Sequence, residues 1–170
     1  FGKAMRSLED GACGFGVNAK GAGELASLDE DDLAAAVSRA SEGRIAYVAG
    51  ALRRGWSVER LYDATRIDPW FLARLHDMIA VQEAVRGLRV EDIDADAMRL
   101  LKQYGTSDAQ IALLTGSDER FVRAYRKGLG VVPSMKTVDT CAAEFESATE
   151  YHYKTYENLM RPAPAARRGV

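Results

Sequence analysis

Apolar residues recur at helical spacing through most of the chain. Ile45, Val48, Ala49 and Leu52 share one face of a segment that ends at Gly55, as in an amphipathic helix with a glycine beyond its end. Similar patterns predict helices over residues 2–10, 28–40, 44–53, 69–86, 95–103, 107–114 and 119–127. Asp29 and Asp68 stand where helix N-caps belong, and Pro69 fills a first helical position.

Three stretches lack this pattern. The glycine-rich residues 11–23 are predicted to be a loop, because glycine loses most backbone entropy on ordering. After Gly130 the helical period is lost, and we expect extended or irregular chain. Residues 161–170 contain two prolines and three arginines with nothing to bury, as in a linker. The prediction is an all-α, irregular multi-helix domain with an extended C-terminal segment.

An internal repeat relates residues 57–75 to residues 107–125 without gaps, fifty residues apart. Ser57 matches Ser107, and Asp68 matches Asp118. Each copy is predicted to be a short helix with a serine cap, a turn, and a second helix with an aspartate cap. The fold therefore contains two helix-turn-helix-like pairs.

Such pairs suggest a DNA-binding module as an alternative function. Arg120, Arg123, Arg126 and Lys127 would then face phosphates or base edges. Against this hypothesis, the second helix of the first copy begins with Pro69, Trp70, Phe71 and Leu72, an apolar surface unsuited to a groove. The net charge of −2 also provides no field that would attract nucleic acid. Helix pairs of this kind commonly build all-α cores, and we favour that structural interpretation.

Composition fits one globular domain in a reducing compartment. The 170 residues are 47% hydrophobic and 28% charged, enough for a core without disulfides. Cys13 and Cys141 are far apart and lack metal-ligand spacing, so we expect free thiols, no metal site and a cytoplasmic location. No apolar run is long enough to span a bilayer. The chain begins at Phe1 without a methionine, and we expect a fragment of a longer protein.

The segment 138–157, VDTCAAEFESATEYHYKTYE, contains side chains that could perform chemistry. Asp139, Cys141, Glu144 and His152 could form a thiol or carboxylate site with a histidine base. Cys141 is followed by two alanines and no phosphate-binding loop is nearby, so we expect core packing instead. The tyrosines are expected to lay this segment across a protein surface while their hydroxyls stay hydrated or bonded; they are Tyr151, Tyr153 and Tyr156.

The string VDTCAAEF, followed by T-x-Y-x-Y-x-T-Y-E, resembles the end of the central helical domain of the carbamoyl-phosphate synthase large subunit. Three more strings agree in order: KAMRSLE at 3–9, IDPWFL at 67–72 and SDAQIALLTG at 107–116. The chain departs from the family at PSMK, residues 133–136, where an aromatic usually precedes the lysine, and at Lys154, where serine is usual.

This resemblance implies a structural and oligomerisation domain between two ATP-grasp halves. Residues 1–10 would end the first half, 11–157 would form the helical domain, and 158–170 would lead to the second half. The parent ligase would make carbamoyl phosphate from bicarbonate, ammonia released by a glutaminase subunit or domain, and two ATP with Mg²⁺. The resemblance assigns no catalytic, cofactor or metal residue to this chain.

Two sets of residues are expected to perform the structural role. Trp70, Phe71, Leu72 and Phe121 are predicted to organise the core, so that Phe71→Ala would cost about 3–5 kcal/mol. A strip on helix 28–40, including Leu33 and Val37, could form a contact between identical helices. The alternative, that this strip packs inward, is equally consistent with the pattern.

Overall fold

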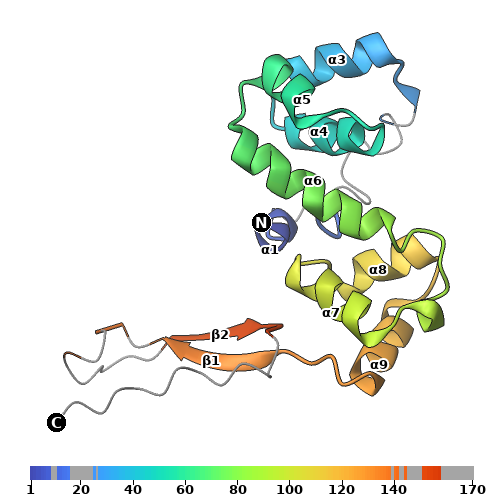
Figure 1. The fold of residues 1–170 in the computed structure, drawn as a ribbon, viewed down its shortest axis with the longest axis vertical. Coiled ribbons are helices and arrows are strands. Elements are labelled where there is room, and N and C mark those ends of the chain that lie inside the picture. Colours follow the sequence, from blue (N-terminus) through green and yellow to red (C-terminus); the bar gives the residue numbers. More distant parts are fainter. Residues whose placement is uncertain are drawn as a thin grey trace.

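The computed structural model describes residues 1–8, 11–15, 25, 27–138, 140–141, 144 and 151–157. The expected linker at 158–170 and most of the glycine-rich loop lie outside these residues, as do Asp139 and Phe145. The elements in Figure 1 are α1 (Gly2–Arg6), α3 (Glu30–Ser38), α4 (Arg44–Arg53), α5 (Val58–Thr65), α6 (Pro69–Glu83), the 3-10 turn Val90–Asp92, α7 (Ala95–Gln103), α8 (Asp108–Thr115), α9 (Glu119–Gly128), β1 (Ser134–Val138) and β2 (Tyr151–Thr155).

The all-α class predicted from the sequence is confirmed, and most helices begin where a polar side chain caps them. Asp29 accepts from the Asp32 amide, and Ser57 accepts from the Arg60 amide. The same type of cap starts four other helices, at Asp68, Asp94, Ser107 and Asp118. These bonds satisfy amides that a helix leaves without partners in its first turn. None of the described helices is long and apolar enough to cross a membrane.

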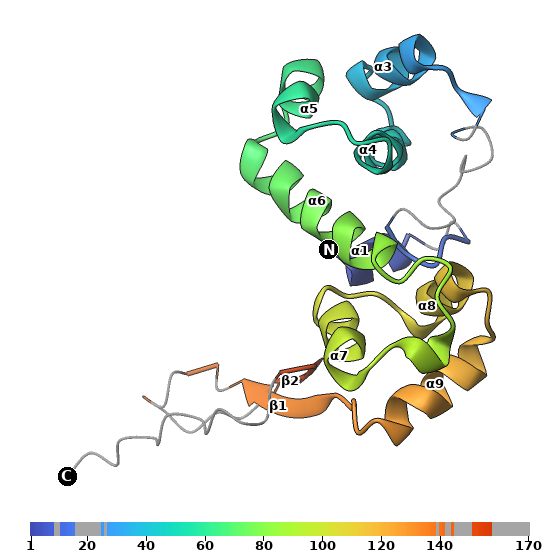
Figure 2. The same cartoon turned by 45° about the vertical axis from the view of Figure 1, so that its right-hand side comes forward.

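Two apolar cores lie on either side of α6, which crosses between them (Figures 1 and 2). It contributes Leu72, Leu75, Met78 and Ile79 to a core shared with α3, α4 and α5. Val85, just after α6, belongs to the other core, with α7, α8 and α9. One helix thus joins both cores, and close packing on both sides makes the pair stiff.

The predicted core organisers are only partly right. Leu72 is fully buried, but Trp70, Phe71 and Phe121 are exposed by 63%, 58% and 45%. Trp70 and Phe71 pack against each other as a T-shaped pair with ring centroids 5.0 Å apart. Each residue turns the side-chain direction by about 100° around a helix, so Leu72 faces the core while the two preceding aromatics face outward. The cores are built mostly from aliphatic side chains, together with the buried aromatic residues Phe15 and Trp56.

The strip expected to mediate self-association packs inward. Leu33 and Val37 have no exposed surface in the single chain. They belong to the core that α3 shares with α4 and α5. A side chain buried by its own chain cannot also form a contact between copies, so the inward-packing alternative applies to both residues.

The repeat is longer in the structure than the sequence comparison indicated. Besides α5–α6 and α8–α9, it includes the preceding helices α4 and α7, fifty residues apart. Gly55 and Gly105 follow these helices with φ of 82° and 83°, a left-handed conformation that favours glycine. Thr65 and Thr115 each donate their hydroxyl to the carbonyl four residues earlier. We call α4–α6 the first helical unit and α7–α9 the second.

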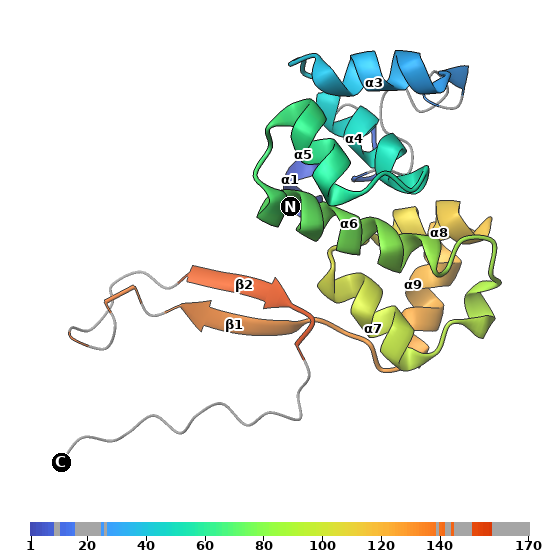
Figure 3. The same cartoon turned by 45° about the horizontal axis from the view of Figure 1, so that its top comes forward.

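The two strands form an antiparallel hairpin, in agreement with the extended chain expected after Gly130. Ser134 lies opposite Thr155, and Val138 lies opposite Tyr151. The hairpin extends to one side of the second helical unit (Figure 3). Beyond β2, Gln103 of α7 donates to the carbonyl of Tyr156, at 2.8 Å. The tail thereby returns to the helices.

Candidate functional site

The tail residues considered for catalysis have structural surroundings. His152 lies in β2, where its Nδ1 is 3.0 Å from the Thr137 hydroxyl on the facing strand. The Glu144 amide donates to the Cys141 carbonyl at 2.9 Å. Asp139, the fourth member of that group, lies outside the described residues. In the part of the chain that the structure describes, no three His, Cys, Asp or Glu side chains gather as a metal site would require.

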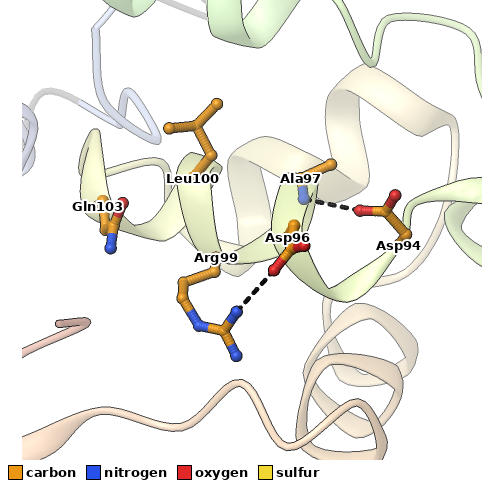
Figure 4. A pocket seen from close by; sticks show the side chains of 6 residues that line it. All are labelled: Asp94, Asp96, Ala97, Arg99, Leu100 and Gln103. Carbon is orange, nitrogen blue, oxygen red and sulfur yellow. Dashed lines mark hydrogen bonds and ion pairs between the residues drawn. The ribbon is translucent and has the colours of Figure 1, made fainter. Parts of the chain in front are cut away.

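The surface hollow beside α7 is lined by polar groups that already have partners (Figure 4). It has a volume of about 510 Å³. The Asp94 carboxylate accepts from the Ala97 amide at 2.8 Å, and Asp96 pairs with Arg99 at 3.0 Å. Gln103 is the donor that holds Tyr156. These interactions stabilise α7 itself, and the hollow lacks the convergent polar groups of a ligand site.

The most distinctive chemical feature is a buried ionic cluster in the second helical unit, formed by Lys102, Asp108 and Arg126. Their side chains are 8%, 7% and 6% exposed. Asp108 Oδ1 accepts from Lys102 Nζ at 2.9 Å and from Arg126 Nε at 3.0 Å. Asp108 Oδ2 accepts from Arg126 Nη2 at 2.9 Å. The fork-to-fork geometry is the strong form of an arginine–carboxylate pair.

The cations of this cluster also satisfy backbone groups. Lys102 Nζ donates to the Thr106 carbonyl at 2.7 Å, and Arg126 Nη1 donates to the Val131 carbonyl at 2.6 Å. The cluster therefore ties the turn after α7 and the segment after α9 to α8. Buried charges need this saturation with hydrogen bonds, because each loses its hydration on folding.

Titration behaviour follows from the same geometry. Burial alone would raise the pKa of Asp108, but the hydrogen bonds and charges of Arg126 and Lys102 lower it from 3.8 to about 2. Burial lowers the pKa of Lys102, and Asp108 offsets part of that effect. A carboxylate with so low a pKa and fully occupied oxygens is a poor general base. The cluster is equipped for structural support.

Tyr156 covers the cluster from outside. Its ring centroid lies 5.5 Å from Lys102 Nζ and 5.6 Å from Arg126 Cζ, within the range of cation–π attraction. Burial raises the pKa of the Tyr156 phenol. Together with the bond from Gln103, this contact fastens the tail segment to the second helical unit.

The amino-terminal segment is fastened to the same unit. Arg6 of α1 donates to the Gly105 carbonyl at 2.8 Å. Gln110 of α8 donates to the Phe15 carbonyl at 3.3 Å. Gly2 packs closely against this unit, since a Cβ there would lie 3.0 Å from the Gly105 carbonyl oxygen. Both ends of the described chain are thus held by α7–α9.

Sequence reasoning missed the ionic cluster. Arg126 was considered for nucleic-acid contact, and Lys102 and Asp108 were not singled out. A signal existed in the sequence repeat and just beyond its limits, because at the same offset these positions correspond to Leu52, Val58 and His76. Where one copy has two apolar residues and the other has two opposite charges, the charged residues are expected to be buried as an ion pair.

Comparison with known proteins places the chain among large chains of one enzyme family. Residues 1–130 match the family model described as carbamoyl-phosphate synthetase large chain, oligomerisation domain. Three similar proteins are each named carbamoyl phosphate synthase large chain. The chain is 42% identical to the one from Nostoc over 98% of its length, 41% to the one from Rhodopirellula baltica over 93%, and 41% to the one from Pseudomonas aeruginosa over 99%.

The chain spans 15% of the length of each of these relatives. Their similarity therefore concerns one part of a much longer protein, and it extends past residue 130 into the hairpin and tail. The family match covers all of the described helices and, apart from Val131, the buried residues of both cores. The chain belongs to the family of oligomerisation domains of the carbamoyl-phosphate synthetase large chain.

Proposed function

We propose that the chain is the structural spacer of a carbamoyl-phosphate synthase large chain. The parent enzyme would make carbamoyl phosphate from bicarbonate, glutamine-derived ammonia and two ATP in the cytoplasm, keeping one phosphoryl group in the product and releasing the other as phosphate. Flanking ATP-grasp halves would bind ATP and Mg²⁺, and a glutaminase subunit or domain would supply ammonia. Within the chain we place the boundaries at 1–10, 11–157 and 158–170, as expected from the sequence.

The family match over residues 1–130 supports this proposal most directly. The architecture suits a spacer as well, because α6 joins both cores and α7–α9 hold both ends of the described chain. Short-lived intermediates would require two active sites at a fixed separation, which a close-packed spacer provides.

A kink in α6 tests the spacer role in the full-length enzyme. Ala80 is exposed in the second half of the bridging helix, and Ala80→Pro would remove a helical hydrogen bond and bend the helix. We expect each half to keep ATP hydrolysis while carbamoyl phosphate synthesis falls. Ala80→Ser is the control with unchanged geometry. Unchanged synthesis in a correctly folded Ala80→Pro enzyme would contradict the proposal.

We also propose that the domain self-associates, through Trp70 and Phe71 instead of Leu33 and Val37. The family description names oligomerisation, and this exposed aromatic pair at the start of α6 resembles the aromatic anchors of interfaces. Trp70→Ala with Phe71→Ala should lower the mass of the assembled enzyme in sedimentation. His76→Ala, an exposed position on another side of the same helix, is the control. An unchanged mass would reject this surface.

DNA binding is disfavoured by the arrangement of cations on α9. Arg126 is buried against Asp108, and Arg123 pairs with Glu119 at 2.5 Å. The equivalent helix of the first unit presents Trp70 and Phe71 to solvent. A duplex shift assay at low salt should show no binding above that of a neutral control protein.

A further inference from the structure

One face of the hairpin carries exposed tyrosines. Val138 pairs with Tyr151 and Lys136 pairs with Tyr153, and directly opposed residues project from the same side of a sheet. Tyr151 is 63% exposed, Tyr153 44% and Val138 43%. We call this side the tyrosine face. The opposite face carries Met135, Thr137, His152 and Lys154.

Among the described residues, the segment after β2 fastens the hairpin to the helices, because Tyr156 packs on the ionic cluster and Gln103 donates to its carbonyl. Lys136 of β1 pairs with Glu157 of the same segment. An isolated two-stranded hairpin is marginally stable in water, so a face of this kind gains from a covering surface. Tyrosine suits such a surface, because its ring buries apolar area while its hydroxyl keeps a hydrogen bond.

We propose that the tyrosine face docks on a part of the parent large chain outside residues 1–170. This inference rests on the proposed spacer function and adds a contact surface to it. The chain spans 15% of its relatives' length, so most of a parent chain would lie outside these residues. Covalent linkage gives such a neighbour an effective concentration on the order of millimolar.

The size of the face favours this neighbour over a second copy. Each strand has five residues, and at about 3.3 Å per residue and about 4.8 Å between strands the face covers on the order of 200 Å². A stable contact between separate chains buries about 800 Å² on each partner. The covering surface should combine an apolar patch for the rings with acceptors for the tyrosine hydroxyls.

Hydroxyl-radical footprinting of the unmodified full-length enzyme tests this contact. Tyr151 and Met135 are exposed almost equally, at 63% and 61%, but on opposite faces. Each oxidation rate is divided by that of the same residue in the urea-unfolded chain. We expect Tyr151 and Tyr153 to be protected several-fold more than Met135, with no change on dilution. Equal protection would overturn the inference, as would protection that disappears on dilution, the sign of a second copy.

Photo-crosslinking identifies the covering segment. Benzoylphenylalanine replaces Tyr153 in one variant and Lys154, its neighbour on the opposite face, in another. The first variant should crosslink within one chain to a peptide outside residues 1–170, and the second should not. Links between two chains, or equal links from both positions, would contradict the proposal.

The unmodified enzyme used for footprinting is also assayed for carbamoyl phosphate synthesis. Synthesis without tyrosine protection rejects the docking surface alone. Protection without synthesis rejects the proposed enzyme function and leaves the docking surface supported.

Discussion

The two helical units have the same helix order and turns, and the same caps on their second and third helices, but different interiors. Positions 52 and 58 of the first unit are Leu52, which is buried, and Val58, which packs against the apolar core. The corresponding positions of the second unit are Lys102 and Asp108, paired inside it. The same helical arrangement can therefore enclose either apolar side chains or a cluster of charged ones, provided that every buried charge has its partners.

Their surroundings explain the difference. The first unit is covered by α3, where Trp56 donates its indole N–H to Glu30 at 2.8 Å. The second unit instead receives the tail, through Tyr156 on the ionic cluster. Buried ion pairs add little net stability, and in some proteins they select one arrangement, because any other leaves charges unpaired. We infer that the buried ionic cluster determines how the two ends of the described chain are bound to the second helical unit.

The largest predicted effect comes from removing the central carboxylate. Asp108→Ala leaves two buried cations without their partner and should cost about 3–5 kcal/mol of unfolding free energy. Val58→Ala, at the equivalent position of the first unit, should cost about 1 kcal/mol. Urea unfolding of both variants measures the difference, and equal costs would refute the comparison.

An apolar replacement of the whole cluster is the matched control for that loss. The triple variant Lys102→Leu, Asp108→Val and Arg126→Leu removes all three charges together, so no buried ion is left without a partner. It should therefore recover most of the stability that Asp108→Ala loses. If the triple variant were as unstable as Asp108→Ala, the second helical unit would need the buried charges themselves for its stability.

The next largest effect is a difference in unfolding free energy between alanine variants of two adjacent residues on α6. Leu72 is fully buried, so Leu72→Ala should cost about 2–5 kcal/mol. Phe71 is 58% exposed, so Phe71→Ala should cost less than about 1 kcal/mol. This replaces the larger loss expected when Phe71 was assigned to the core. Thermal unfolding of the two variants measures both losses. A larger loss for Phe71→Ala than for Leu72→Ala would return Phe71 to the core.

Acid should weaken the second unit before the first. The pKa of Asp108 is lowered to about 2 in the folded chain from an ordinary 3.8, so its contribution is present above about pH 4 and is lost as pH falls toward 2. The loss amounts to about 2 kcal/mol. Hydrogen exchange between pH 4 and pH 2 should accelerate in α8 and α9 relative to α4 and α5. In Asp108→Asn this pH-dependent difference should disappear.

The smallest effect concerns the turn within each unit. Arg66 has a φ of 58°, and Gly116 has a φ of 65° at the equivalent position. Arg66→Gly should relieve left-handed strain and Gly116→Ala should introduce it, with opposite changes of about 1 kcal/mol or less. Chemical denaturation measures both. Changes of the same sign would show that the two turns are not equivalent.

Several features were predictable because they depend on neighbours along the chain. Asp29, Ser57 and Asp68 cap helices through bonds to amides two or three residues away, so their roles could be predicted without the fold. The repeat and the family strings are likewise properties of the residue order. The hairpin was expected only as extended chain, since its pairing joins residues from Ser134 to Thr155 across a long connection.

The sequence by itself determined the helices, their caps, the repeat and the family. Only the tertiary structure decided which sides of the helices are buried. Leu33 proved to be core and Phe71 surface, although both fit an amphipathic pattern. The partners of Asp108 come from α7 and α9, at residues 102 and 126. Helical hydrogen bonds span about four residues, whereas burial and charge pairing depend on how whole helices pack together.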